Sequence, residues 1–280
     1  MEPLIDGNLR AKIYRLYDLF KRRGPSLKAS PATQVSCPIC LDRGIVYNGE
    51  QAHICRCMRE QALRNRLKFC QPGYYFRNRT FADFDLAFYS RDYIDPDSGI
   101  SYYQMAAATL KACQQFVETA ANDPHARGLF LSGPVGSGKT FLAMCITNAL
   151  IARGREVVFV VVPDLLDELR ATYDRTDQNV SEIDLLDLCG NAEVLVLDDL
   201  GAHNYTEWTK NKIYSILNHR LNLLLPTVIT SNLDLDQLEE YLGQRTTSRI
   251  IEMCLVYRLR VHEDIRYAKA RRSRPSPGPG

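Results

Sequence analysis

Three features are missing from this sequence, and each absence excludes a class of protein. No stretch approaches the roughly 20 consecutive apolar residues that a membrane helix needs, and residues 1–10 lack the apolar core of a secretory signal. Charge of one sign is not in excess either, because 35 basic and 33 acidic side chains leave a formal net charge of +2. The sequence therefore predicts a cytoplasmic protein with no membrane contact, whose contacts with polyanions come from local patches.

The nine cysteines are of two main kinds. Four single cysteines stand among apolar residues, a setting typical of small buried side chains in a reducing compartment: Cys113, Cys145, Cys189 and Cys254. Four others form two close pairs, which are Cys37-Pro38-Ile39-Cys40 and Cys55-Arg56-Cys57.

The two cysteine pairs predict a structural zinc site. The 14 residues between Cys40 and Cys55 include two glycines, so a hairpin could bring Cys37, Cys40, Cys55 and Cys57 around one Zn²⁺. Metal binding would supply folding free energy that a small core cannot. His53 or Cys70 could replace one ligand. The alternatives are surface thiols or a redox-active C-x-x-C, although the latter would need a thioredoxin-like βαβ setting that is absent.

The chain divides into three predicted parts. Residues 1–75 hold the zinc site between a basic amphipathic helix over 8–23 and a second helix over 59–69. Residues 76–268 alternate helical patterns with short apolar runs, which predict buried parallel strands at 128–132, 156–162, 193–197 and 227–230. This alternation indicates an α/β domain in which helices flank a parallel sheet. Residues 269–280 are rich in Lys, Arg, Pro and Gly and are expected to be disordered.

Residues 133–140 fit the phosphate-loop pattern G-x-x-x-x-G-K-[ST], between a predicted strand and a helical run over 141–152. The eight residues are Gly133, Pro134, Val135, Gly136, Ser137, Gly138, Lys139 and Thr140. Glycines let backbone N–H groups converge on phosphates, Lys139 brings a mobile charge to them, and Thr140 would offer a hydroxyl to Mg²⁺. A glycine-rich turn that binds nothing is the alternative. Eight matches in the required context favour ATP binding.

Polar side chains end two further predicted strands. Asp198 and Asp199 follow the strand 193–197, at the edge of the sheet where ligands bind in such folds. Asp198 would hold Mg²⁺, and Asp199 would orient or polarise the attacking water. Asn232 follows the strand 227–230 and could reach the γ-phosphate or that water. Solvated aspartates in a turn and a helix cap are the simpler explanations of these residues.

Together these residues resemble the DnaC/DnaI helicase loaders of the AAA+ class, which are related to the IstB-type transposition ATPases. The match covers most of residues 80–267. Besides the phosphate loop it rests on the order and spacing of Thr80-Phe81-Ala82-Asp83-Phe84, Leu197-Asp198-Asp199-Leu200-Gly201, Asn218-His219-Arg220, Thr230-Ser231-Asn232 and Arg245-Thr246-Thr247-Ser248-Arg249-Ile250. The resemblance implies an AAA+ P-loop fold without a large C-terminal lid domain.

The resemblance also implies roles for individual residues. Asn232 would be the sensor of the γ-phosphate, and Arg249 an arginine finger that acts on ATP held by a neighbouring subunit, with Arg245 as a helper. Arg266, in a segment similar to the family's Asp-x-Arg close, would face the phosphates. Without the resemblance, Arg245 and Arg249 would be assigned to surface solvation or an ion pair.

The implied activity is Mg-dependent ATP hydrolysis that acts as a release switch. Residues 1–75 would hold the replicative DNA helicase, as the zinc-bearing N-terminal domain of Gram-positive loaders does, and the assembly would place that helicase on single-stranded DNA. Self-assembly through the arginine finger would make hydrolysis depend on neighbouring subunits.

Three other functions fit parts of the sequence. A transposition helper of the IstB type would remodel target DNA, but that group typically has a different N-terminal region. A P-loop kinase would need an acceptor pocket and an arginine-rich lid, which nothing between Asp199 and Asn232 suggests. A non-enzymatic zinc-binding nucleic-acid module would use the basic residues of 56–68 and 266–274 but leave the ATP motifs without a role.

Overall fold

The computed structural model describes residues 39–40, 43–48, 51–55, 78–174, 182–202 and 205–272. The chain forms two compact units, Met1–Arg59 and Glu60–Gly280. The predicted helices over 8–23 and 59–69 and the predicted boundary near residue 75 lie outside the described residues. Within those described ranges, no helix is long and apolar enough to cross a membrane.

In the first unit, a hairpin connects the two cysteine pairs. Its strands are β1 (Ile45–Asn48) and β2 (Gln51–Ile54), which pair in antiparallel fashion. Cys40 and Cys55 are both buried beside it. The N–H of Gly44 donates to Cys40 Sγ at 3.3 Å, and the N–H of Cys55 donates to the Gly44 carbonyl at 2.8 Å. The hairpin thus brings one cysteine of each pair together, as the spacing predicts.

A five-stranded parallel sheet organises the second unit, with the spatial order β4-β5-β6-β3-β7. The strands are β3 (Gly128–Ser132), β4 (Val157–Val161), β5 (Val194–Leu200), β6 (Thr227–Ser231) and β7 (Cys254–Arg258). The predicted α/β class with a helix-flanked parallel sheet is confirmed. Strand β7 was not predicted, because it begins directly after a helix with no turn residue between the two.

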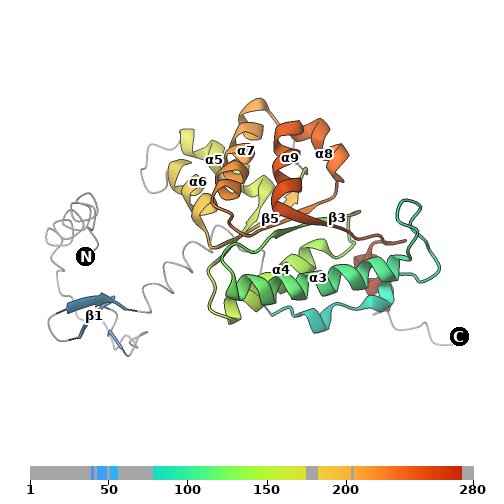
Figure 1. The fold of residues 1–280 in the computed structure, drawn as a ribbon, viewed down its shortest axis with the longest axis horizontal. Coiled ribbons are helices and arrows are strands. Elements are labelled where there is room, and N and C mark those ends of the chain that lie inside the picture. Colours follow the sequence, from blue (N-terminus) through green and yellow to red (C-terminus); the bar gives the residue numbers. More distant parts are fainter. Residues whose placement is uncertain are drawn as a thin grey trace, which may run out of the picture. The chain divides into compact units, whose positions relative to one another are not determined.

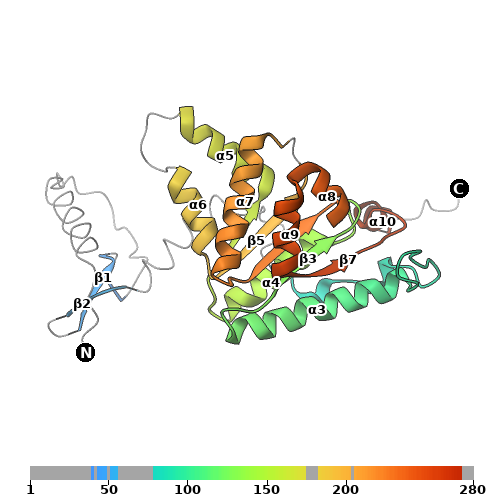
Figure 2. The ribbon, with the colours of Figure 1, turned by 45° about the horizontal axis from the view of Figure 1, so that its top comes forward.

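Helices cover both faces of this sheet (Figures 1 and 2). One face carries α3 (Tyr102–Asn122) and α4 (Lys139–Ala152). The other carries α5 (Val162–Asp174), α6 (Glu182–Asn191), α7 (Glu207–Asn222), α8 (Leu235–Leu242) and α9 (Gln244–Met253). This two-sided cover explains why the strands are continuous apolar runs rather than alternating ones.

The sheet separates two hydrophobic cores. In β3, Leu129 and Leu131 pack into the core beneath α3 and α4, whereas Phe130 packs into the core of the opposite face. All three side chains are at most 1% exposed. Because burying each such side chain contributes about 1.5–3 kcal/mol, the cores fix the strands and therefore the positions of their carboxyl ends.

Local polar signals set where several helices begin. Ser101 and Gln104 form a capping box at the start of α3, with Ser101 Oγ accepting the Gln104 N–H at 3.2 Å and Gln104 Oε1 accepting the Ser101 N–H at 2.8 Å. Asp234 and Gln237 form the same motif at α8. These caps satisfy N–H groups that the first turn of a helix leaves without partners.

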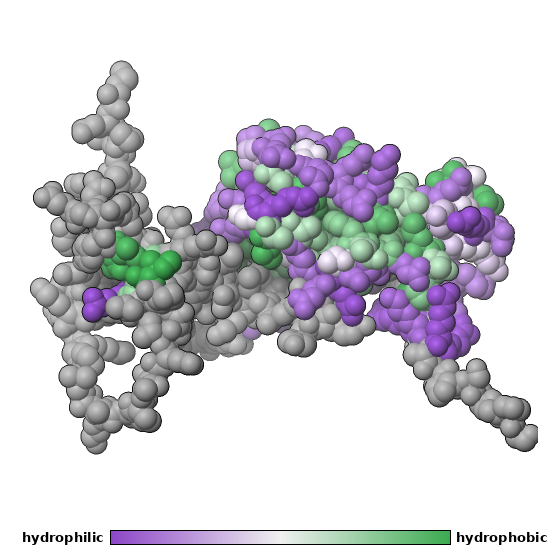
Figure 3. Space-filling model, turned by 90° about the horizontal axis from the view of Figure 1, so that it is seen from below, coloured by the Kyte–Doolittle hydropathy of each residue, from purple (hydrophilic) through white to green (hydrophobic). Residues whose placement is uncertain are grey.

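Three short helices lie on the side of α4. They are the 3₁₀ turns η2 (Phe81–Asp83) and η3 (Leu86–Phe88) and the helix α10 (Ile265–Arg272). Helix α10 runs four residues beyond the boundary at 268 that composition suggested, because Lys269 and Arg272 lie over the ring of Phe88, at 5.4 and 4.2 Å from its centroid. The last turn of this helix presents the exposed side chains of Lys269, Arg271 and Arg272, and hydrophilic residues cover much of the face shown in Figure 3.

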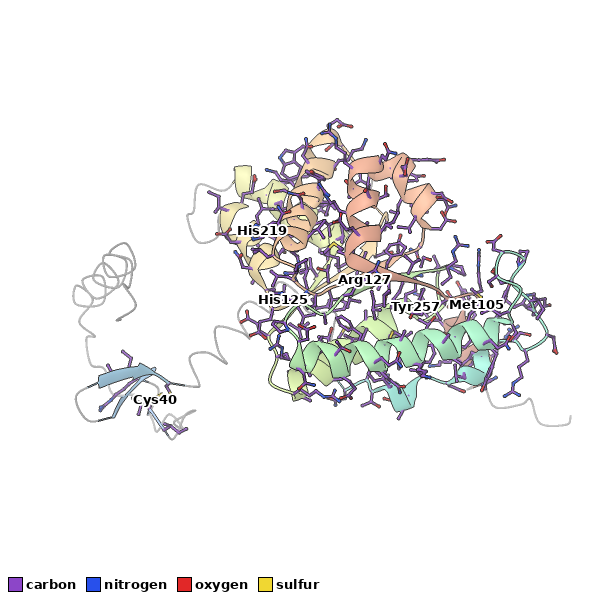
Figure 4. The ribbon with its side chains drawn as sticks, viewed as in Figure 1. Cys40, Met105, His125, Arg127, His219 and Tyr257 are labelled. Carbon is purple, nitrogen blue, oxygen red and sulfur yellow. The ribbon has the colours of Figure 1, made fainter. Side chains whose placement is uncertain are left out.

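Arg127 stabilises the start of the edge strand β7 through hydrogen bonds (Figure 4). Its Nη2 donates to the carbonyls of Ile251 at 3.1 Å and Cys254 at 3.3 Å, which belong to the last turn of α9 and the first residue of β7. One guanidinium therefore holds the abrupt helix-to-strand junction that the sequence pattern does not mark.

Candidate nucleotide-binding site

The polar residues at the carboxyl ends of β3, β5 and β6 meet at one edge of the sheet, because these three strands are neighbours and parallel. A cavity of about 520 Å³ lies there, within the size range typical of small-ligand sites. It is lined by the phosphate loop and by Asp198, Asp199 and Asn232, with η2, η3 and α10 on its other side. Of the predicted nucleotide residues, Asp198, Asp199, Asn232 and five of the eight loop residues line the cavity, whereas Gly133, Pro134 and Ser137 do not.

Two glycines are required by the conformation of the phosphate loop. Gly138 has φ of 93° and Gly136 has φ of 72°, both in the left-handed region that other residues avoid. A Cβ on Gly136 would also lie 2.0 Å from the carboxyl group of Asp264. On the other side, the buried Tyr89 hydroxyl donates to the Ser137 carbonyl at 2.7 Å. Asp264 and Tyr89 therefore support the loop from segments far away in the sequence.

Lys139 is a buried cation at the centre of the site, with 5% of its surface exposed. Its Nζ donates to the carbonyls of Gly133 and Pro134 at 2.8 and 2.9 Å and to Asn232 Oδ1 at 2.8 Å. Burial lowers the pKa of Lys139 to about 8, and the nearby carboxylates of Asp199 and Asp198 oppose that shift. The site therefore holds an ammonium group that bound anionic phosphates would stabilise.

Asp198 is the more buried of the two acids, with 5% of its surface exposed. It accepts hydrogen bonds from the Thr140 hydroxyl, at 2.9 and 3.1 Å to its two oxygens, and from the Thr230 hydroxyl at 2.6 Å. Burial raises the pKa of Asp198, and these two hydroxyls oppose the shift. A desolvated carboxylate beside a threonine hydroxyl is a set of hard oxygen donors, and it fits Mg²⁺.

Asp199 has an unusual backbone, with φ of 61° in a residue that is not glycine. Its N–H donates to Thr230 Oγ1 at 2.9 Å, and its Oδ1 accepts from Asn232 Nδ2 at 2.7 Å. Because Asn232 also accepts from Lys139, an unbroken chain of hydrogen bonds runs from the phosphate loop through Asn232 to Asp199.

Part of the cavity lining is aromatic, and sequence reasoning did not identify it. Phe84 lies 6.1 Å from Phe141 between ring centroids, and Lys269 Nζ is 5.7 Å from the centroid of Phe141. Phe88 also lines the cavity. Flat apolar rings beside cations fit a heteroaromatic base. Of these residues, only Phe84 stands in a motif that the sequence analysis used.

The predicted arginines lie in two different places. Arg266 lines the cavity. Arg245 and Arg249 are on α9, outside the residues that line the cavity. Arg249 Nη1 is 3.4 Å from Glu252 Oε2, and a hydrogen bond with Tyr214, together with Glu252, raises the pKa of Arg249. Arg249 therefore does not contribute to the nucleotide cavity of its own chain.

The predicted zinc site lies only partly within the described residues. Cys40 and Cys55 are described, whereas Cys37, Cys57 and Cys70 and the side chain of His53 are not. Among the described residues, no three His, Cys, Asp or Glu side chains are placed to hold a metal ion. The zinc site stays a prediction.

The fold and this cavity define a P-loop nucleotide-binding domain of the AAA+ class. Residues 50–266 match the family model described as IstB-like ATP binding protein. The chain belongs to the family of IstB-like ATP-binding proteins, and the resemblance seen in its motifs is confirmed.

Curated relatives include two replicative helicase loaders. The chain is 32% identical to DnaI of Bacillus subtilis over 135 residues, covering 48% of this chain and 42% of that protein. It is 29% identical to DnaC of Escherichia coli over 141 residues, covering 50% and 56%. The chain thus spans about half the length of the curated relatives it matches.

Solved structures of similar proteins include the DnaC helicase loader and DnaI. The first has a TM-score of 0.53 at 25% identity and covers 67% of this chain and 99% of its own. The second has a TM-score of 0.53 at 27% identity and covers 70% and 96%.

Proposed function

We propose that this protein is a helicase loader driven by ATP: it binds and hydrolyses ATP, holds the replicative DNA helicase, and places it on single-stranded DNA. Hydrolysis of ATP to ADP and phosphate is the step that releases the helicase. Membership of an ATP-binding family and similarity to proteins named replicative helicase loaders support the proposal.

In this mechanism each residue at the strand ends has a distinct task. The loop N–H groups and Lys139 bind the phosphates, while Asp199 orients and polarises the attacking water. Thr140 and Asp198 would hold Mg²⁺, which when bound neutralises phosphate charge. Asn232 hydrogen-bonds to both Lys139 and Asp199, so it holds the group that binds phosphate and the group that orients water in a fixed relation to each other. This link is the observation that supports the ATPase part of the proposal, while helicase loading rests on the similarity to the loaders.

The first test is ATP hydrolysis by the full chain and by Asp199→Asn. The substitution keeps the shape of the side chain but removes the charge that polarises water. We expect turnover to fall about 10²-fold or more, while the ATP dissociation constant changes by less than about threefold. Asp236→Asn, on the first turn of α8, is the matched control and should keep full activity. Equal turnover in Asp199→Asn and the native protein would remove Asp199 from the mechanism.

The second test concerns the partner and the metal. We propose that residues 1–75 bind the helicase and that Cys37, Cys40, Cys55 and Cys57 hold one Zn²⁺. The full chain should retain the replicative helicase of its own organism in a pull-down, and the double variant Cys37→Ser/Cys40→Ser should lose both the helicase and its bound zinc, measured by atomic emission. If the variant lost its zinc but still retained the helicase, helicase binding would not depend on the zinc site.

A transposition helper is the second candidate, favoured by the IstB-like family model. It shares the ATPase site and differs in its partner. Binding to a transposase rather than to the helicase, with native ATP hydrolysis, would favour this candidate.

A further inference from the structure

Strand β5 contains a bulge at its two acidic residues. The register pairs Leu197 with Ile229 and Leu200 with Ser231, so that Asp198 and Asp199 lie opposite the single residue Thr230. A bulge interrupts the ladder of backbone hydrogen bonds and changes the direction of its side chains. The backbone N–H of an acid at this position therefore needs a partner from elsewhere.

The side chain of Thr230 supplies that partner. Its Oγ1 accepts the Asp199 N–H at 2.9 Å and donates to Asp198 Oδ1 at 2.6 Å. A hydroxyl has one proton, so once its lone pair accepts from Asp199, the proton is directed at Asp198. Thr230 is 1% exposed, so its hydroxyl is largely shielded from solvent. One hydroxyl thus contacts both acids.

These two bonds act on different parts of the acids. The bond to Asp198 fixes the direction of a carboxylate. The bond from Asp199 holds a backbone with φ of 61°, a conformation that is strained in residues other than glycine. That backbone in turn aims the Asp199 carboxylate at Asn232.

Thr140 also donates to Asp198, but it cannot replace Thr230. Thr140 lines the cavity, and the proposed function uses its oxygen to hold Mg²⁺. Thr230 is not among the residues that line the cavity, so its two bonds to the acids do not compete with a ligand.

We propose that Thr230 is a positioning residue for ATP hydrolysis: its buried hydroxyl orients Asp198 and Asp199 together, and a methyl group in its place uncouples nucleotide binding from turnover. The proposal rests on the proposed ATPase function. It does not require Thr230 to touch ATP.

The test compares Thr230→Val, which keeps the volume and removes the hydroxyl, with Thr230→Ser, which keeps the hydroxyl. In the full chain, Thr230→Val should lower kcat roughly 10- to 100-fold, because a hydrogen bond to the charged Asp198 and one from the Asp199 N–H are lost. It should raise the Mg²⁺ concentration for half-maximal activity and leave the ATP dissociation constant within about threefold. Thr230→Ser should recover kcat to within about threefold of the native value.

Thr109→Val is the matched control. Thr109 is also 1% exposed, and its hydroxyl donates to the Met105 carbonyl at 2.8 Å within α3. The substitution Thr109→Val removes an equally buried hydroxyl that does not contact the acids, so the kcat of this variant should be native. Melting curves with and without ATP identify folding defects. If Thr230→Val does not fold, Thr230→Ala replaces it, and the same loss of kcat is expected.

Three results would overturn the proposal. Native kcat in Thr230→Val shows that the hydroxyl is dispensable. Equal losses in the Val and Ser variants show that the methyl group, rather than the hydroxyl, matters. A parallel loss of ATP binding shows a merely structural role. If the native protein itself binds ATP without hydrolysing it, the ATPase function fails first, and the proposal fails with it.

Discussion

Lys139 has an ammonium group whose charge is opposed by burial and supported by its neighbours. Its pKa is lowered to about 8, chiefly by burial. Bound phosphates favour the charged form, so nucleotide binding raises this pKa again. Below about pH 8 the lysine is charged with or without nucleotide, whereas above it the free protein must take up a proton to bind.

We therefore predict that ATP affinity is constant below about pH 8 and falls as the pH rises further, by up to about tenfold per pH unit. Titration calorimetry at pH 8.5 and above, in two buffers with different ionisation enthalpies, should detect proton uptake on binding. At pH 7 Lys139 should take up no proton on ATP binding, so it should cause no difference between the binding enthalpies in the two buffers. An affinity that stays constant up to pH 9.5 would contradict the prediction.

Residues of the site were predictable where their chemistry is local. The phosphate loop, Asp198, Asp199 and Asn232 each stand in a short segment whose residue types are required by phosphate or metal binding. Tyr89 was not predictable, because its bond to Ser137 spans 48 residues. The role of Thr230 depends on a bulge in the neighbouring strand, and no sequence pattern marks a bulge of that kind.

Arg220 acts at the scale of elements, because one fully buried side chain ties together the end of α6 and the start of β6. Its guanidinium donates to the carbonyls of Cys189, Gly190, Ala192 and Pro226 and to Thr227 Oγ1, at 2.7–3.2 Å. Arg220 belongs to a segment used for the family resemblance. Because Arg220 does not line the nucleotide cavity, these contacts give it a structural role rather than a role in nucleotide binding.

We predict that Arg220→Met lowers the free energy of unfolding by about 3 kcal/mol or more, because each buried acceptor left without a partner costs about 1–3 kcal/mol. Urea unfolding followed by circular dichroism measures the change. Arg153→Met is the control, because Arg153 pairs with Glu118 at the surface and such pairs contribute about 0–1 kcal/mol. Similar losses in the two variants would show that the buried carbonyls find other partners.

Elements were predictable where their apolar pattern is bounded by turn residues. β3 was expected at its observed bounds, but β5 extends to Leu200, past the predicted end at 197, because the bulge keeps the two acids within the strand. Helix α10 and strand β7 depend on tertiary contacts, with Phe88 for α10 and with β3 and Arg127 for β7. Such contacts leave no local signal.

At the scale of the whole molecule, the nucleotide cavity and Arg249 lie in different regions of one chain. Tyr214 and Glu252 hold the guanidinium of Arg249 on α9, and the Arg249 side chain is 35% exposed. An arginine that does not reach its own cavity can still act on a neighbour's, if identical chains assemble head to tail. The proposed arginine finger therefore requires that an active site be completed by two subunits.

This requirement predicts that two inactive variants restore activity when mixed. Asp199→Asn has an intact Arg249 but an inactive site, and Arg249→Ala has an intact site but supplies no arginine, which should cost about 10³-fold in turnover. In an equal mixture, about one quarter of the interfaces combine an intact site with an intact arginine, since each condition holds for half of the subunits. ATP hydrolysis should then reach about a quarter of the native rate.

The control mixture pairs Arg249→Ala with the double variant Asp199→Asn/Arg249→Ala, in which every site still lacks an arginine. Both mixtures contain the same number of intact sites, so a difference between them measures the contribution of Arg249 from another subunit. If the first mixture hydrolyses ATP no faster than the second, Arg249 does not act across an interface. Its position on α9 would then be explained by its contacts with Tyr214 and Glu252 within its own chain.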